Sequence, residues 1–332
     1  MHSLRDLLER LAERLWYQRR GLAFALCLPV LGPGTLITWA LSRRRLRRRI
    51  PRPGAVPVIG VGNLALGGTG KTQVVLALAA RAIALGRRVA VVARGHGGTQ
   101  PGPVVVSPGA DAAAFGDEPV LLQRRLPGAV VIVARDRVAG VAFGVERGCD
   151  LVLLDDGLQQ ISIAPARRLW VFGAESPLGN GALLPLGPLR DLIAAVRSDD
   201  VVWLQGEGSG GALARVDVRS RTVPAASSHA LRGRRVFAFA GIARPERFFR
   251  TLAEAGGTLV GTARFADHRR FGERDLEWLC ARAASLGAEV LVCTEKDAVR
   301  LPHGDRPLPI VALETWFEIF EGQAAVDRLL QL

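Results

Sequence analysis

Val61-Gly-Asn-Leu-Ala-Leu-Gly-Gly-Thr-Gly-Lys-Thr72 is the most informative segment of this 332-residue chain. From Ala65 onward it nearly matches the pattern G-x-x-x-x-G-K-[ST], with Ala65 in place of the first glycine. The apolar residues 56–62 predict a buried strand before the loop, and residues 71–85 predict a helix that ends at Gly86. A strand, a glycine-rich loop and a helix in this order are typical of a P-loop, which binds nucleotide phosphates.

The residues of this loop suit the phosphates of ATP. Glycines let backbone amides turn toward phosphate oxygens without hindrance from a Cβ atom, and the helix that follows points its first amides at the same anion. Lys71 is expected to bridge the β- and γ-phosphates, and Thr72 to bind Mg²⁺. We therefore predict that the loop binds ATP through Ala65, Leu66, Gly67, Gly68, Thr69, Gly70, Lys71 and Thr72.

A second apolar strand, residues 151–154, ends in Asp155 and Asp156. Acids at the end of such a strand are a common partner of a P-loop, because a carboxylate there can hold the magnesium of the bound nucleotide. Asp155 is therefore predicted as a metal ligand together with Thr72, directly or through water.

The rest of the chain alternates strands with helical stretches, which predicts a doubly wound parallel sheet. A second alternation begins at Arg235 and predicts a smaller α/β unit. Further strands are expected at residues 88–93, 129–134, 170–172, 201–204, 236–240, 258–265, 289–294 and 309–313. We predict a membrane-associating helical segment at 1–52, a P-loop kinase domain at 53–225, and a smaller domain at 226–332 that contributes to the active site.

The positive charge is concentrated at the N-terminus. Residues 1–52 hold 12 arginines and three acids, a net charge of +9, so the other 280 residues carry only +4 of the formal +13. A nucleic-acid-binding module would need basic and aromatic residues interleaved over the fold, yet Tyr17 is the only tyrosine. Next to a long apolar run, this charge instead predicts contact with a membrane surface that contains anionic lipids, and no nucleic-acid partner.

That apolar run covers Gly21–Leu41, 21 residues without a charge, after an amphipathic stretch whose apolar positions are 4, 7, 8, 11, 15 and 16. Pro29 and the Gly32–Gly34 segment are expected to break a helix near its middle. Arginines flank the run on both sides, which favours both ends in the cytoplasm. We predict a shallow hairpin or two short interfacial helices rather than a span. A buried helical hairpin of the soluble fold is the alternative.

Lysine is nearly absent. Of 44 cationic residues 42 are arginine, and the only lysines are Lys71 and Lys296. These two positions are candidates for sites that need a compact ammonium group, which a planar guanidinium cannot replace. The four cysteines lack C-x-x-C spacing, which argues against a disulfide scaffold and suits a reducing cytosol.

The chain resembles the tetraacyldisaccharide 4′-kinase family, the lipid A 4′-kinases of Gram-negative bacteria. Residues 61–72 match the nucleotide loop of that family, and blocks in the same order follow to about residue 300. These blocks are Ala93-Arg-Gly-His-Gly-Gly98, Gly116-Asp-Glu-Pro119, Leu154-Asp-Asp-Gly-Leu-Gln159, Gly179-Asn-Gly181, Leu184-Pro-Leu-Gly-Pro-Leu-Arg190, the segment 240–249, Phe265-Ala-Asp-His268 and Thr294-Glu-Lys-Asp-Ala298.

This resemblance implies that ATP and Mg²⁺ phosphorylate the 4′-hydroxyl of a lipid-linked glucosamine disaccharide 1-phosphate on the cytoplasmic face of the inner membrane. It also implies a catalytic pair, Asp117 and His268, in which the carboxylate accepts the hydroxyl proton. Glu118 and Asp156 would support the metal or the base. Arg190 would neutralise phosphate charge. The enzyme is expected to act as a monomer.

Arg190, Asp191, Asn180 and His96 are the residues predicted to contact the substrate. The chain departs from the family pattern at four positions, where His96 replaces a tyrosine, Gln160 a histidine, Asp191 a glutamate and Gln73 a proline. The alternative function is a dimeric P-loop ATPase that positions proteins on a membrane. Such loops carry a signature lysine where this chain has Leu66, which counts against that reading.

Overall fold

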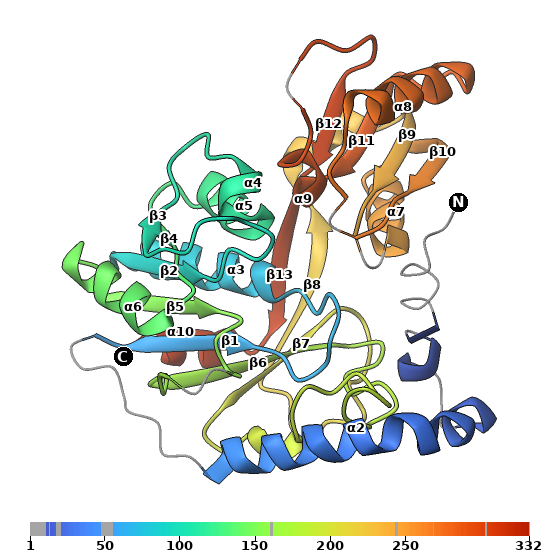
Figure 1. Ribbon diagram of the computed structural model, residues 1–332. Coiled ribbons are helices and arrows are strands. Elements are labelled where there is room, and N and C mark those ends of the chain that lie inside the picture. Colours follow the sequence, from blue (N-terminus) through green and yellow to red (C-terminus); the bar gives the residue numbers. More distant parts are fainter. Residues whose placement is uncertain are drawn as a thin grey trace.

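The computed structural model describes residues 11–12, 14–17, 21–47, 56–159, 162–242, 245–267, 269–302 and 304–331 (Figure 1). The first of its two sheets has nine strands. In spatial order these are β13 (Thr315–Glu321), β8 (Val218–Pro224), β7 (Val201–Gln205), β6 (Arg167–Gly173), β1 (Val58–Gly62), β5 (Leu151–Asp155), β2 (Val89–Ala93), β4 (Val130–Val133) and β3 (Val104–Val105). Neighbours from β8 to β4 pair in parallel, and β13 and β3 add antiparallel edges.

Helices cover both faces of this sheet, which explains why its central strands are continuous apolar runs. On one face α3 (Lys71–Ala84), α5 (Asp117–Arg125) and α10 (Gln323–Leu330) pack against residues such as Ile59 and Leu153. On the other face α6 (Arg137–Glu146) packs against Val92 and Val152. The short α4 (Ala112–Phe115) precedes α5, and 3₁₀ turns occur at Ile193–Ala195 and Ala226–Leu231. The predicted doubly wound sheet is confirmed.

The second sheet has the order β10 (Thr258–Arg264), β9 (Arg235–Ala240), β11 (Val290–Thr294) and β12 (Ile310–Leu313), all parallel. The helices α7 (Pro245–Glu254) and α8 (Glu273–Ser285) cover opposite faces, and the short α9 (Glu295–Ala298) follows β11. The predicted smaller α/β unit is therefore present. Its division at residue 226 stays a prediction, because the chain returns after Leu313 to the first sheet as β13.

Strands with continuous apolar sequence were predicted to within a few residues, whereas the two-residue β3 and the longer β8 and β13 were missed. The strand β8 carries arginines at alternate positions, as in Val218-Arg-Ser-Arg-Thr222, and the exposed alternate positions of β13 are Trp316, Glu318 and Phe320. Neither strand is a continuous apolar run, because one face of this antiparallel edge is open to solvent. In Figure 1 these two long strands connect the two sheets.

The prediction of a broken N-terminal hairpin was wrong, because α2 is one continuous helix from Leu22 to Arg47 that contains Pro29 and Pro33. A proline removes one backbone donor, and the remaining turns still close around it. The hydroxyls of Thr35 and Thr38 donate to the carbonyls of Leu31 and Gly34, both at 3.2 Å. The alternative of a buried hairpin is also wrong, since Leu22 and Val30 are each 78% exposed.

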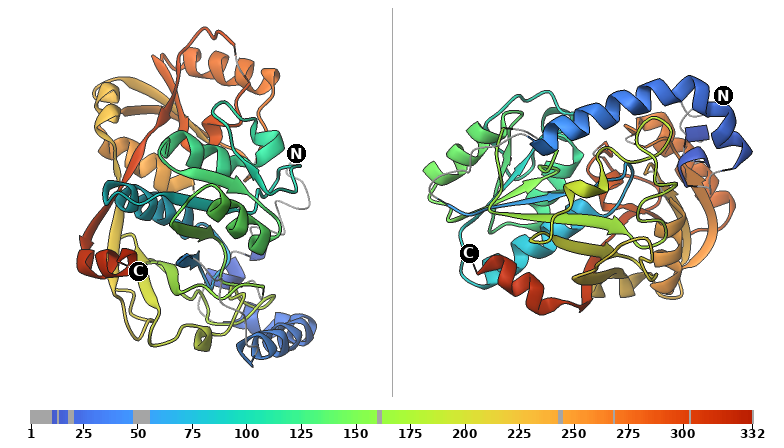
Figure 2. Two further views of the ribbon diagram at one scale, coloured as in Figure 1. Left: turned by 90° about the vertical axis from the view of Figure 1, so that its left-hand side faces the viewer. Right: turned by 90° about the horizontal axis from the view of Figure 1, so that it is seen from below.

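One stripe of α2 lies against the protein. Ser42 is fully buried, and the side chain of Leu46 packs against a cluster that includes Trp170 and Phe172 of β6. The amide of Leu186 donates to the Thr35 hydroxyl at 3.4 Å. By length and composition alone α2 is able to cross a membrane, which is weak evidence for a span. The right-hand view of Figure 2 shows it lengthwise as a single rod at the edge of the molecule.

Candidate active site

The P-loop has the geometry that its glycines predict. Gly67 and Gly70 have φ angles of +109° and +84°, in the left-handed region that favours glycine, and α3 begins directly after Gly70. A Cβ atom on Gly68 would meet no atom within 4 Å, so this glycine faces open space where a phosphate can approach. The amide of Leu66 donates to the carbonyl of Pro188 at 2.8 Å, which fixes the loop to the rest of the domain.

Asn63 organises the loop from the side of β1. Its side-chain amide donates to the carbonyl of Ala65 at 2.6 Å and to the hydroxyl of Thr69 at 3.0 Å. Its oxygen accepts from the ammonium group of Lys71 at 2.9 Å. Sequence reasoning missed this residue, although Asn63 is one of only two asparagines in the chain, a signal of the same kind as the lysine scarcity.

Asp155 and Asp156 end β5 beside the loop, in contrasting environments. Burial and the nearby charge of Glu118 raise the pKa of Asp155 to about 7. Burial would also raise the pKa of Asp156, but hydrogen bonds and charge from Arg190 and Lys71 outweigh it and hold that pKa at about 2. Asp156 adopts a φ of +52°, which is rare outside glycine and turns its carboxylate toward these cations.

The donor set beside the loop fits Mg²⁺. Oδ1 of Asp155 is buried and accepts no hydrogen bond within the described chain, although a buried carboxylate oxygen normally has a partner. The described residues hold no group of three or more histidines, cysteines or acids that would bind a metal unaided. Mg²⁺ typically uses one or two protein carboxylates together with substrate phosphates and water, so one buried aspartate beside a P-loop is sufficient.

Arg190 reaches the same site from a distant segment. Its guanidinium donates to both carboxylate oxygens of Asp156, at 3.0 and 3.2 Å, and also to the backbone and side-chain oxygens of Asn63. The ammonium of Lys71 lies 3.4 Å from the Asp156 carboxylate. The structure therefore brings the predicted residues Lys71, Asp156 and Arg190 together.

A second cluster of charge lies where α5 meets α9. Asp117 and Glu118 occupy the first turn of α5, where the helix dipole favours acids. Glu118 lies 2.8 Å from the ammonium of Lys296, and Asp117 lies 3.3 Å from the guanidinium of Arg300. Because the charge of Glu118 acts on Asp155, this cluster adjoins the metal end of the P-loop site.

Arg300 was not predicted, and it is nearly enclosed, with its side chain 3% exposed. It lies 3.1 Å from Asp297, whose carboxylate accepts from the amide of Gly241 at 3.1 Å and so ties α9 to the end of β9. His268, the predicted partner of Asp117, lies outside the described residues, as does Gln160, so the predicted catalytic pair stays a prediction.

The other predicted substrate residues are Asp191, Asn180 and His96. Asp191 is buried and bonds to the hydroxyl of Ser42 and to Arg45 at 3.4 Å, so its carboxylate faces α2. The Asn180 side chain stabilises the turn in which it lies: its amide group donates to the carbonyl of Leu186, and its oxygen accepts from the amide of Ala182, both at 2.9 Å. His96 is exposed, in a loop whose backbone packs on Gly116, directly before Asp117.

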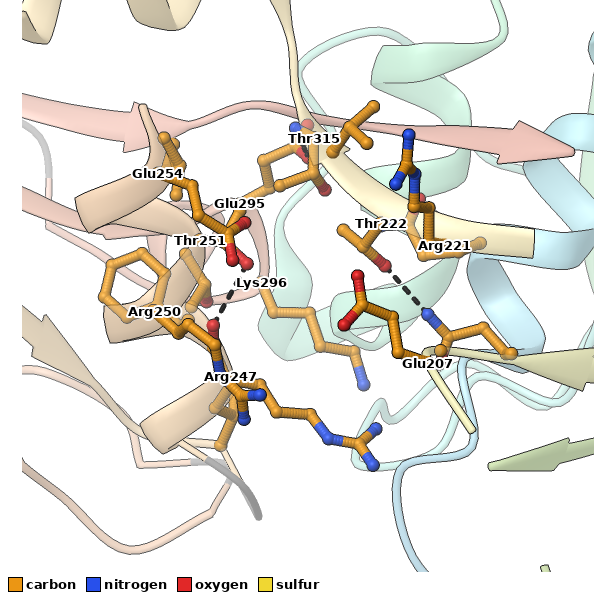
Figure 3. Close-up of a pocket in the computed structure, with 18 of the residues that line it drawn as sticks. Glu207, Arg221, Thr222, Arg247, Arg250, Thr251, Glu254, Glu295, Lys296 and Thr315 are labelled. Carbon is orange, nitrogen blue, oxygen red and sulfur yellow. Dashed lines mark hydrogen bonds between the residues drawn. The ribbon is translucent and has the colours of Figure 1, made fainter. Parts of the chain in front are cut away.

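A cleft of about 580 Å³ adjoins the start of α3 and separates the two sheets. On the side of the first sheet it is lined by Gln73 of α3 and Gln205 of β7. On the side of the second sheet it is lined by Arg247 and Phe248 of α7 and by Lys296 of α9. Figure 3 shows charged side chains that converge on it from both sides. The cleft is large enough for the nucleoside part of a nucleotide whose phosphates lie in the loop.

Comparisons with known proteins agree with these motifs. The family described as tetraacyldisaccharide-1-P 4′-kinase matches residues 28–332. The tetraacyldisaccharide 4′-kinase of Methylobacterium radiotolerans is 46% identical over 82% of this chain and 85% of its own length. That of Rhodospirillum centenum is 43% identical over 96% and 95%. A crystal structure of LpxK from Aquifex aeolicus in complex with ATP covers 93% of this chain and 98% of its own, with a TM-score of 0.72 at 22% identity, and thus shares the fold.

Proposed function

Because the chain belongs to the tetraacyldisaccharide-1-P 4′-kinase family, it is an ATP-dependent lipid A 4′-kinase, and we propose how its residues perform the transfer. The acceptor is the 4′-hydroxyl of a tetraacylated glucosamine disaccharide 1-phosphate. One observation supports the assignment of roles: Glu118, in the first turn of α5, is near enough for its charge to raise the pKa of the buried Asp155, so the start of α5 and the P-loop site act on one another.

The P-loop amides and Lys71 bind the β- and γ-phosphates, with Lys71 held in place by Asn63. Thr72 and Asp155 would hold Mg²⁺, and Glu118 and Asp156 would support it. The metal, when bound, neutralises charge that develops on the phosphate oxygens. Arg190, fixed by Asp156 and Asn63, adds a second cation beside them.

Asp117 accepts the proton of the 4′-hydroxyl while that oxygen forms its bond to the γ-phosphorus and the bond to the β-phosphate oxygen breaks, which releases ADP. Arg300 holds the Asp117 carboxylate on one side, and we infer that His268 orients it on another. A sugar hydroxyl is a weak nucleophile at neutral pH, so a carboxylate within reach of its proton lowers the barrier.

We also infer that α2 lies in the plane of the cytoplasmic membrane surface and holds the monomeric enzyme there. A spanning helix would be surrounded by lipid, whereas Thr35, Ser42 and Arg45 fix one stripe of α2 to the 183–192 segment. The remaining faces expose leucines, and arginines follow at the end of the helix, which suits insertion beside anionic headgroups. The acyl chains cannot readily leave the bilayer, so the enzyme must approach them.

The decisive experiment uses radiolabelled ATP with the disaccharide 1-phosphate in vesicles, and as control an acceptor that lacks the 4′-hydroxyl. We expect label on the first lipid only. ATP hydrolysis at the same rate without any acceptor would instead support the protein-positioning ATPase. For α2, we expect cysteines placed before Arg19 and after Arg49, in a Cys27→Ser background, to be labelled from the same side of sealed vesicles. Opposite sides would establish a span.

A further inference from the structure

Lys296 is the second lysine of a chain that otherwise uses arginine, and the roles proposed above leave it without one. It lies in α9, directly after β11 of the second sheet, and its side chain lines the cleft. Figure 3 shows it extended from α9 into the space between the two sheets. The sequence pattern and the position therefore single out the same residue.

The contact that Lys296 makes leads back to the metal end of the site. Its ammonium donates to Oε1 of Glu118 at 2.8 Å, across an interface between elements 178 positions apart in sequence. Burial would lower the pKa of Lys296, but Glu118, Asp267 and Asp117 outweigh it, so the lysine stays charged. Glu118 in turn acts on the buried Asp155, whose pKa is raised by the charges of both Glu118 and Asp156, so these carboxylates repel one another.

We propose that Lys296 is a positioning residue, whose ammonium holds the Glu118 carboxylate beside Asp155 and the P-loop. The smaller α/β unit that contains α9, here called the second unit, thereby determines where the carboxylate of Glu118 lies. This inference rests on the proposed function, because it assumes that Glu118 supports the metal–nucleotide complex. The ammonium offsets the repulsion between Glu118 and Asp155, and it is compact enough to fit beside the guanidinium of Arg300, which already holds Asp117.

A matched control lies on the same two helices. Arg125, at the end of α5, forms an ion pair with Glu295 of α9 at 2.6 Å. This pair also joins the two units, but it involves neither Glu118 nor the P-loop. Arg125→Met therefore removes an ion pair of the same interface, without the contact that we propose to matter.

The test compares Lys296→Met, Lys296→Arg, Glu118→Gln, the double variant Lys296→Met/Glu118→Gln, and Arg125→Met in the full chain. The measurements are kcat, the Mg²⁺ concentration for half-maximal rate, the Kd of Mg²⁺ with a non-hydrolysable ATP analogue by calorimetry, and the melting temperature. We expect Lys296→Met to lower kcat about tenfold to a hundredfold, since misplaced groups cost that much, and to weaken analogue binding only when Mg²⁺ is present. Lys296→Arg should fall between Lys296→Met and the wild type.

The double variant decides whether Lys296 acts through Glu118. If it does, Lys296→Met/Glu118→Gln is no slower than Glu118→Gln alone, within about threefold. Effects that multiply, or a loss equally large in Arg125→Met, would overturn the proposal. The variant Lys71→Ala distinguishes a failure of the Lys296 proposal from a failure of the proposed function. If Lys71→Ala is inactive while Lys296→Met turns over normally, only this inference fails; if Lys71→Ala is also active, the proposed function fails.

Discussion

The P-loop and the α5–α9 interface meet at one site but are held together in different ways. The loop is local: Asn63, Thr69 and Lys71 lie within nine residues and bond to one another and to the backbone. The interface joins residues far apart in sequence, through the ion pairs Glu118–Lys296 and Asp117–Arg300. The loop is therefore preorganised by its own sequence, whereas the acids at α5 depend on how the second unit sits.

This difference suggests a division of labour. The loop should keep its shape whatever the second unit does, because the described bonds of Asn63 with Ala65, Thr69 and Lys71 all lie within the P-loop segment. The proposed base and the acid beside it are complete only when α9 contacts α5. Variants of the loop should then weaken phosphate binding itself, whereas variants of the interface should act on transfer and on the Mg²⁺-dependent part of binding.

The largest effect is expected for Asp117→Asn, because asparagine has nearly the shape of aspartate but cannot act as the proposed base. We expect lipid phosphorylation to fall about a thousandfold, in the middle of the range for acid–base assistance, with ATP affinity nearly unchanged. Initial rates with labelled ATP and calorimetric titration of the analogue measure the two quantities. A normal rate in Asp117→Asn across the pH range would assign the base to another group.

Lys71→Ala should act on the other region. We expect turnover to fall at least about a hundredfold and nucleotide binding to weaken with it, because Lys71 bridges the phosphates in both ground and transition states. Lys71→Arg should also fail, since Asn63 and Asp156 leave room for an ammonium group, at 2.9 and 3.4 Å, rather than for a planar fork. An active Lys71→Arg would remove the argument from lysine scarcity.

The variant Asp155→Asn tests how much the burial of the Asp155 carboxylate lowers the free energy of unfolding. The folded-state pKa of Asp155, about 7, lies above its unfolded value near 3.8, so the folded state loses stability as pH rises between them. Asparagine has no charge to bury. Asp155→Asn should therefore be more stable than the wild type above pH 7, on the order of 4 kcal/mol, with a smaller gain at pH 5.

Thermal denaturation of the ligand-free protein at pH 5, 6, 7 and 8 measures this difference. Asp156→Asn is the matched control, because the pKa of Asp156 is held near 2 by Arg190 and Lys71 and its charge is stabilising. That variant should lose stability throughout this pH range. A gain for Asp155→Asn that is equal at all pH values would show that ionisation of Asp155 is not its cause.

The sequence predicts those parts of the molecule that depend on neighbouring residues, and it fails where contacts join residues far apart in the chain. The P-loop, with Gly70 and Lys71, and the apolar strands, such as β5, could be predicted because each is determined by residues that are neighbours in the sequence. Arg300 could not, since nothing near it in sequence shows that Asp117 will lie beside it. The helix α2 was predicted to break because the rule for proline is local, while contacts at Thr35 and Ser42 that fix one of its faces are tertiary.

The smallest effects are expected from the glycines of the loop, which separate backbone strain from ligand contact. Gly68→Ala places a methyl group where no atom lies within 4 Å, so stability should change by less than about 0.5 kcal/mol. ATP binding should nevertheless weaken about tenfold, because the methyl group occupies the approach of a phosphate. Gly70→Ala should lose stability as well, about 1–2 kcal/mol, since its φ is +84°.

Gly86→Ala is the control that completes this set, with a φ of +82° and no atom within 4 Å of an added Cβ, just after α3 and outside the loop. It should lose stability for the same backbone reason as Gly70→Ala, although a Cβ on Gly70 also meets the Gln205 side chain at 3.3 Å, and it should bind ATP normally. Melting temperatures of the three variants test the effect of backbone strain, and titrations with the ATP analogue test the contact with phosphate. If Gly68→Ala binds ATP as the wild type does, the phosphate does not pass over Gly68, and the cradle must be formed by the amides after it.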